Sequence, residues 1–244
     1  MPRHIEVPLL TNDDMAESWL FWNDTPHSPA WNMAADEALL QNAPATGTPL
    51  LRCYAWDRPA VSIGYVQRLD AAPEGFAAVR RPTGGGIVYH DYDFTFSVAF
   101  PMGHWLTGLD RTQSYNWLNR SLQAALQALG FPAELSAREI PHSVERATMV
   151  CFTNPTRYDL LLEGRKVAGS AQRRTSDGLL HQASLHFGKP LPMPREAMTG
   201  ALVKALGTVM EVSMEDFSPS QTLLDEITRL VDTKYGTDAW NNLR

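Results

Sequence analysis

Apolar residues recur at helical spacing in four parts of the chain, and each part carries signals for a helix start or end. Residues 30–40 predict a helix with Asn32 as N-cap and acidic residues in its early turns, where they complement the helix dipole. The other helices are expected over 115–129, closed by Gly130, over 195–206, and from Ser218-Pro219 to about Gly236.

Apolar runs bounded by glycine, proline or polar residues predict strands in the rest of the chain. These strands are expected over 49–56, 60–65, 77–81, 87–90, 93–100, 158–162, 165–169 and 179–187. Glu163-Gly164 supplies the tight turn of a hairpin. Strands and helices alternate irregularly, so we predict an α+β (mixed α/β) fold with one large mixed sheet and packed helices. No repeat or linker divides the chain, and residues 1–244 are expected to form a single domain.

Composition and charge narrow the class of protein. Hydrophobic residues make up 44% of the 244 residues, enough for a full core. The net charge of −6 argues against a nucleic-acid-binding protein, which needs a basic face. No apolar run approaches the ~20 residues that cross a bilayer, and the N-terminus lacks the pattern of a secretory signal. We therefore expect a cytoplasmic enzyme that contacts neither membrane nor nucleic acid.

A glycine-rich loop is the strongest local motif, at residues 80–91 (RRPTGGGIVYHD). Its three consecutive glycines let the backbone approach a ligand closely. Their N–H groups can bind an anion, with Arg80 and Arg81 adding positive charge beside them. The loop is not a P-loop, because no Gly-Lys-Ser/Thr follows. Taken alone, it is either a ligand-binding loop or an ordinary hairpin with solvated arginines.

Lys166 lies in an apolar strand and is followed by small residues, in the segment 164–174 (GRKVAGSAQRR). In a pocket, this ammonium group can hold a carboxylate, a phosphate or a developing oxyanion. The small neighbours would leave room for a ligand against the sheet. On the residues alone, the more common explanation is a lysine on an edge strand, where it prevents aggregation.

The two cysteines of the chain differ in context. Cys151 precedes a predicted strand, in a loop where catalytic groups are common, although a free cysteine is by default a small buried hydrophobe. Cys53 lies in an apolar strand and is expected to be structural. His181 and His186 would face opposite sides of a strand, and no Cys-x-x-Cys or His-Glu-x-x-His occurs, so no metal site is expected.

Four motifs, in their order and spacing, resemble those of the biotin/lipoyl protein ligase (BPL/LPL) superfamily, of the lipoate–protein ligase A kind. They are NMAADEA at 32–38, Trp56 with Pro59, Gly64 and Gln67, the glycine loop at 80–91, and the lysine motif at 164–173. The resemblance extends to about residue 185. It implies a mixed sheet with packed helices and an acyl tunnel between the glycine loop and the lysine strand.

The resemblance also implies roles for individual residues. Lys166 matches the essential lysine of the family, which contacts the carbonyl or carboxyl end of the acyl group. The residues expected to bind substrate are Arg80, Thr83, Gly84, Gly85, Gly86, His90, Gly169, Ser170 and Ala171.

The superfamily contains two kinds of reaction, and residues 151–159 (CFTNPTRYD) favour one of them. With the lysine motif that follows, this segment resembles the octanoyltransferases of the LipM type, which carry the acyl group as a cysteine thioester. In that chemistry Cys151 is the nucleophile and Lys166 lowers the pKa of its thiol and steadies the thioester oxygen. No cofactor is required.

The resemblance thus implies an octanoyl-[acyl carrier protein]:protein N-octanoyltransferase of lipoate biosynthesis, monomeric and without a C-terminal accessory domain. Octanoyl-acyl carrier protein is the expected donor, and the apo glycine-cleavage H protein or an E2 lipoyl domain is the acceptor. Arg173 and Arg174 either steer the acidic donor or are solvated. Two alternatives stay open: an ATP-dependent lipoate–protein ligase that uses ATP and Mg²⁺ to form lipoyl-AMP, and a non-catalytic acyl-binding relative.

Overall fold

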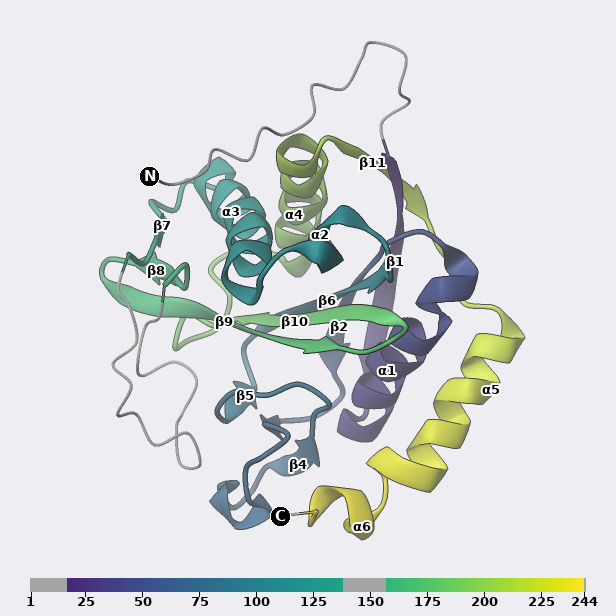
Figure 1. Ribbon diagram of the computed structural model, residues 1–244. Coiled ribbons are helices and arrows are strands. Elements are labelled where there is room, and N and C mark those ends of the chain that lie inside the picture. The colour runs from purple at the N-terminus through teal and green to yellow at the C-terminus, as the bar shows by residue number, and fades with distance from the viewer. Residues whose placement is uncertain (1–16, 138–156, 244) are drawn as a thin grey trace.

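The computed structural model describes residues 17–137 and 157–243, and most of these residues belong to two sheets and their helices (Figure 1). The strands of the large sheet are β1 (Glu17–His27), β2 (Leu50–Trp56), β6 (Phe94–Pro101), β7 (Glu134–Leu135), β8 (Leu160–Leu162), β9 (Arg165–Arg174), β10 (Gly178–Leu185) and β11 (Val212–Asp216). The small sheet contains β3 (Ala60–Ile63), β4 (Ala77–Arg80) and β5 (Val88–His90). The helices are α1 (Pro29–Thr46), α2 (Trp105–Gly108), α3 (Arg111–Ala128), α4 (Arg195–Met210), α5 (Gln221–Leu230) and α6 (Asp238–Asn241), with short helical turns at Leu69–Ala71 and Val231–Tyr235.

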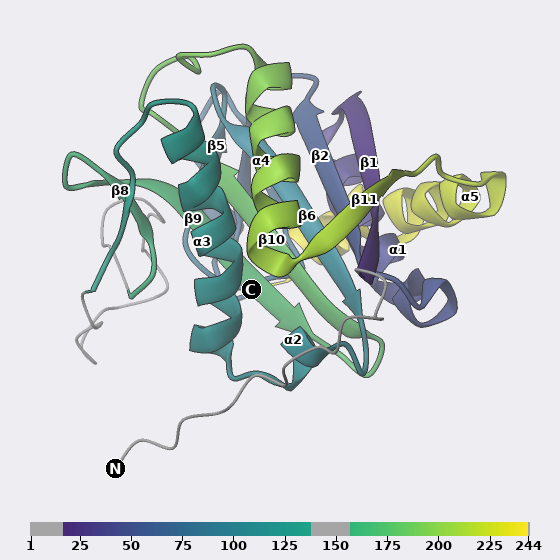
Figure 2. The same ribbon diagram turned by 90° about the horizontal axis from the view of Figure 1, so that it is seen from above.

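Among the described residues, the large sheet has the strand order β11-β1-β2-β6-β10-β9-β8-β7, and the small sheet has the order β4-β3-β5. In the large sheet β1 runs parallel to β11 and to β2, whereas the other neighbours are antiparallel. Helices α3 and α4 pack on one face of this sheet, and α1 with the small sheet lies on the other (Figures 1 and 2). This architecture confirms the predicted mixed α+β fold with packed helices. The assignment of residues 1–244 to one domain stays a prediction.

Two apolar layers hold the large sheet between its helices. The larger one joins strand residues such as Phe96 and Leu185 to Leu122 of α3 and Leu202 of α4. On the opposite face, apolar residues of α1 and α5 pack with β2. Because both faces of β6 and β10 are covered, these two strands are buried along their whole length. They form the rigid floor on which the candidate site is built.

Most predicted elements are confirmed, but some of their bounds differ. Helix α3 starts at Arg111, four residues before the predicted start, and β9 ends at Arg174, five residues beyond the predicted end. The predicted N-caps of α1 and α5 were wrong. The N-cap of α1 is Ser28, whose hydroxyl accepts a hydrogen bond from the Trp31 N–H group, and Asn32 lies inside the helix. The amide of Asn32 instead donates to the carbonyl of Ala55, which ties α1 to the end of β2. At α5 the N-cap is Ser220, two residues beyond the predicted Ser218.

Three strands of the described residues, β1, β7 and β11, were not predicted. β1 carries the polar and proline-containing end Asn23-Asp24-Thr25-Pro26, which a period-two pattern does not favour. Its parallel pairing with both β2 and β11 forms this strand in spite of its sequence. Within the described residues, no helix is both long enough and apolar enough to span a membrane.

Candidate functional site

A mostly apolar cavity lies between β9, β10, α1 and the small sheet. Its lining residues come from far apart in the sequence: Met33, Tyr54, Trp56, Ser62, Arg81, Val88, His90, Thr95, Gly169, Ser170, Ala171, Gln182, Ala183 and Ser184. Its volume of about 30 Å³ is far below the roughly 300–1,000 Å³ of typical small-molecule sites. An acyl chain can therefore enter only if lining side chains move, and the flexible Met33 thioether is well suited to do so.

The structure brings four of the predicted binding residues to this cavity: His90, Gly169, Ser170 and Ala171. Thr83 does not line the cavity, but its hydroxyl donates a hydrogen bond of 2.7 Å to the side chain of Gln182, which does. Their binding roles stay predictions. Arg81 and Val88, which flank the glycine loop, line the cavity, but Gly84, Gly85, Gly86 and Lys166 are not among its lining residues.

Arg81 organises the glycine loop from within. Its guanidinium donates to the carbonyls of Gly84, Gly86 and Ser62, at 2.6–3.1 Å. Gly85 has φ +92°, and a Cβ atom there would lie 2.9 Å from the Arg81 guanidinium. The loop therefore folds around an arginine that also lines the cavity, which explains why it needs glycine at this position.

Arg80 has a different environment from the one predicted. Its side chain is fully buried, and its guanidinium donates to the backbone carbonyls of Gly64, Tyr65, Gln67, Trp240 and Asn241. It thus ties β4 to α6 and to the turn after β3. Arg81, and not Arg80, is the arginine found in the cavity lining.

Gly64 allows the glycine loop to lie against β3. A Cβ atom at this position would lie 2.0 Å from the carbonyl oxygen of Gly85. We expect Gly64→Ala to displace the loop and to lower the free energy of unfolding by about 1–3 kcal/mol, as overpacking does elsewhere. Urea denaturation measures this loss.

Gly84→Ala is the matched control, because a Cβ atom there meets nothing within 4 Å. Its stability is expected to stay within about 0.5 kcal/mol of the wild type. Equal destabilisation by both alanines would refute the close contact between Gly64 and Gly85.

His90 forms part of a buried polar network at the side of the cavity. Its Nδ1 atom lies 2.7 Å from Asp93 Oδ2, and its Nε2 atom lies 2.9 Å from Ser62 Oγ. Its ring stacks on Trp56 with centroids 3.8 Å apart. Burial by itself would raise the pKa of Asp93. The pKa nevertheless lies below its usual range, because the His90 ring and nearby hydroxyl donors stabilise the carboxylate.

A β-bulge in β9 aims the Lys166 side chain. Leu160 lies opposite Ala168 and Leu161 opposite Lys166, so Val167 is an extra residue. Val167 and Ala168 both pack into the apolar layer under α3 and α4. Side-chain alternation is therefore interrupted, and Lys166 falls on the opposite face of the sheet, the face that carries the cavity.

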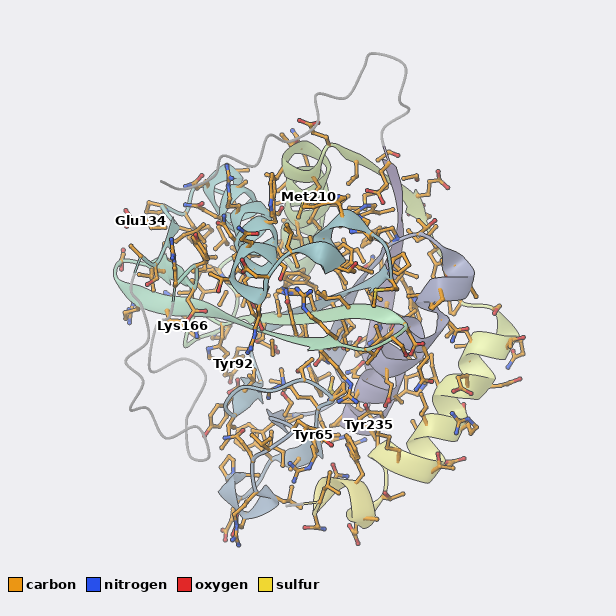
Figure 3. The ribbon with its side chains drawn as sticks, in the orientation of Figure 1. Tyr65, Tyr92, Glu134, Lys166, Met210 and Tyr235 are labelled. Atoms are coloured by element: carbon orange, nitrogen blue, oxygen red, sulfur yellow. The ribbon has the colours of Figure 1, made fainter. Side chains whose placement is uncertain are left out.

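Lys166 is nearly buried and paired with a carboxylate. Its side chain is 5% exposed, and its Nζ atom lies 2.7 Å from Oδ2 of Asp159. β9 lies between β10 and β8, so the prediction of an edge-strand lysine was wrong. Figure 3 shows Lys166 at the β7–β9 end of the large sheet, and Gly169 of the cavity lining follows three residues later.

Cys151 lies outside the described residues, so its predicted role as nucleophile stays a prediction. Cys53 is fully buried in β2, and burial raises the pKa of its thiol to about 12. A thiol with such a pKa is not a nucleophile at neutral pH.

The arginines after the lysine motif contact nearby protein groups. Arg173 donates to the carbonyl of Pro82, and Arg174 donates to the carbonyl of Thr107 and the hydroxyl of Ser114. Steering of the donor by these side chains stays a prediction. No group of three or more His, Cys, Asp or Glu side chains that could hold a metal occurs within residues 17–137 and 157–243.

The sequence analysis missed a buried network behind the cavity, centred on Asp36. One carboxylate oxygen accepts from Arg52 and Ser97, at 2.8 and 2.7 Å. The other accepts from Tyr54 and Gln182, at 2.9 and 2.7 Å. Tyr54 and Gln182 line the cavity, so Asp36 fixes part of its wall. The sequence did contain a sign of this network, because two apolar segments each carry a charged residue: Asp36 in α1 and Arg52 in β2.

Comparison with known proteins decides the family. The model of the lipoyl protein ligase A/B catalytic domain matches residues 28–220. The chain belongs to this family. The family membership and the LipM-like character inferred from the motifs are thereby confirmed.

Several relatives within the family are named octanoyltransferase LipM. The one from Macrococcus caseolyticus is 38% identical over 184 residues, which cover 70% of this chain and 66% of that protein. The one from Brevibacillus brevis is 32% identical, covering 92% of this chain and 99% of that protein. Identities of 30–38% to such relatives support octanoyl transfer in lipoate biosynthesis, and therefore an acyltransferase.

Solved structures of the family share the fold. A lipoate-protein ligase A bound with ATP superposes with a TM-score of 0.77 at 21% identity, covering 92% of this chain and 98% of that chain. A bi-partite lipoate protein ligase from Thermoplasma acidophilum gives a TM-score of 0.72 at 22% identity, and the match covers 93% of this chain and 96% of that chain. At these identities the similarity extends to the fold alone.

Proposed function

We propose that this protein transfers an octanoyl group from acyl carrier protein to a lysine of a lipoyl-carrier protein, through a thioester on Cys151. The observation that carries the proposal is the similarity to several LipM octanoyltransferases over most of the chain. The apolar cavity beside the lysine strand is consistent with it, since a medium-length acyl tail needs an apolar site next to the reacting carbonyl.

The reaction proceeds in two steps, acylation of Cys151 and transfer of the acyl group to the acceptor lysine. The Cys151 thiolate attacks the thioester carbonyl of the donor, and the carrier thiol leaves with the proton that Cys151 gave up. The neutral amine of the acceptor lysine then attacks the new thioester. An amide forms, the bond to the Cys151 sulfur breaks, and a proton from the amine passes to that sulfur. Lys166 donates to the carbonyl oxygen as negative charge develops there.

The transfer needs no cofactor, because the donor thioester is already activated. The ATP-dependent alternative would need free lipoate or octanoate, ATP and Mg²⁺. The similarity to an ATP-bound ligase is one of fold and does not favour it. The acceptor is a lipoyl domain of an E2 subunit or the glycine-cleavage H protein, and the enzyme acts as a cytoplasmic monomer.

Intact-mass spectrometry tests the proposal. Wild-type protein mixed with octanoyl-acyl carrier protein, without ATP, is expected to gain the mass of one octanoyl group and to lose it when apo H protein is added. Cys151→Ser is expected to show neither the adduct nor the transfer, because a serine hydroxyl there lacks the acidity of a thiol.

Cys53→Ala is the matched control, since the Cys53 thiol is buried and its pKa is about 12. This variant is expected to form the adduct like the wild type. Full transfer by Cys151→Ser would refute the covalent route. Acylation only with free acid and ATP would establish the ligase, and failure of every donor would leave a non-catalytic acyl-binding protein.

A further inference from the structure

A second hollow lies beside Lys166, separate from the acyl cavity. It is an open groove of about 370 Å³ between the end of α3, the β8–β9 hairpin and the segment after β10. This volume falls in the lower part of the range for small-molecule sites. Its lining residues are Phe131, Pro132, Leu162, Glu163, Arg165, Lys166, Val167, His186, Phe187, Gly188, Lys189 and Pro192. We call it the hairpin groove.

The floor of the hairpin groove is apolar and its rim carries positive charge. The rings of Phe131 and Phe187 contact each other at a tilt of 55°, with centroids 5.5 Å apart, and Leu162 also belongs to the lining. Arg165 and Lys189 are exposed, and neither has an ion-pair partner in the part of the chain that the structure describes. Glu163 is the acidic member of the described lining.

Local charge matters here because the whole chain carries a net charge of −6. An acidic donor is repelled by most of such a surface and approaches where cations are exposed. The hairpin groove presents two such cations directly beside Lys166. It also offers an apolar floor, made by Phe131, Leu162 and Phe187.

We propose that the hairpin groove binds the phosphopantetheine arm of the acyl donor, with its phosphodiester at Arg165 and Lys189. This inference rests on the proposed octanoyl transfer. The arm has an anionic end and a long, weakly polar stem, which match the cationic rim and the apolar floor. The groove and the acyl cavity share no lining residue, so arm and tail occupy different hollows.

Two small donors that differ only in the phosphate test this assignment: octanoyl-pantetheine and octanoyl-4′-phosphopantetheine. The rate of single-turnover acylation is followed by intact mass. The wild type is expected to react about tenfold faster with the phosphorylated donor, the effect of one or two charge-assisted contacts. The double variant Arg165→Glu/Lys189→Glu is expected to lose this preference and to react more slowly with octanoyl-acyl carrier protein.

Lys204→Glu is the matched control, because it reverses an exposed charge on α4, away from the groove. It is expected to keep the preference. No preference in the wild type, or a preference that survives the double reversal, would overturn the inference. Equal slowing of both small donors by the double reversal would also overturn it, since the phosphate would then not be what the cations bind.

These outcomes are distinct from failure of the proposed function. If octanoyl-acyl carrier protein does not acylate the wild type at all, the transferase assignment fails before the groove is tested. If it does acylate the wild type, the comparison of the two small donors decides the groove alone.

Discussion

Lys166→Ala is expected to slow octanoyl transfer by about 10²–10³-fold, the loss seen when one donor to a developing oxyanion is removed. The β-bulge at Val167 directs this side chain to the face of the sheet that carries the cavity, and Asp159 holds its ammonium group at 2.7 Å. The loss should appear both in formation of the acyl-enzyme and in its discharge, because each step develops charge on the same oxygen. Quenched-flow mass spectrometry with octanoyl-acyl carrier protein measures both.

A structural role of Lys166 has to be separated from a chemical one. Removing Lys166 leaves the Asp159 carboxylate, 10% exposed, without its lysine and costs stability for that reason. The double variant Lys166→Met/Asp159→Asn removes both charges and is expected to regain most of the stability, but none of the activity. If the double variant also regains transfer, Lys166 acts only by pairing with Asp159, and the proposed role in the reaction is wrong.

Asp36→Ala is expected to lower the free energy of unfolding by about 3–5 kcal/mol, the cost of breaking a buried ion pair by removing one partner. Asp36 and Arg52 are both fully buried. The carboxylate also accepts hydrogen bonds from Tyr54 and Gln182, whose polar atoms would lose a buried partner. Burial and the neighbouring Asp36 carboxylate raise the pKa of Tyr54 well above its usual range, so its hydroxyl remains a donor to this network. Urea denaturation followed by tryptophan fluorescence measures the change.

Asp232→Ala provides the control, since this residue is exposed in the helical turn that follows α5. It is expected to change stability by no more than about 0.5 kcal/mol. A loss below about 1 kcal/mol for Asp36→Ala would show that Asp24, which also pairs with Arg52, suffices to compensate the buried guanidinium.

The regular elements were predictable wherever local pattern and local packing agree. Leu118, Leu122 and Ala125 recur on one face of α3, and this is the face that packs in the core. The turn of the β8–β9 hairpin was also predicted, from the Glu163-Gly164 pair between two apolar runs. Both residues adopt positive φ, at 50° and 76°, as a tight hairpin turn requires.

β1 and the caps of α1 and α5 were not predictable in the same way. A parallel strand is stabilised by partners distant in sequence, and β1 pairs with residues as far along as Asp216. Ser218 and Ser220 are both acceptable N-caps by residue type, and the structure selects Ser220, whose hydroxyl accepts from the Leu223 N–H group.

The sequence by itself determined the family, the mixed α+β class and the glycine and lysine motifs, because each of these depends on residue type and spacing along the chain. The tertiary structure decided which of two adjacent arginines lines the cavity, since β4 turns Arg80 toward α6 and Arg81 toward the loop. It also decided that Lys166 is an interior, paired side chain. One extra residue in β9 reverses the face on which a side chain lies, and that register depends on hydrogen bonds to β8, which no local pattern encodes.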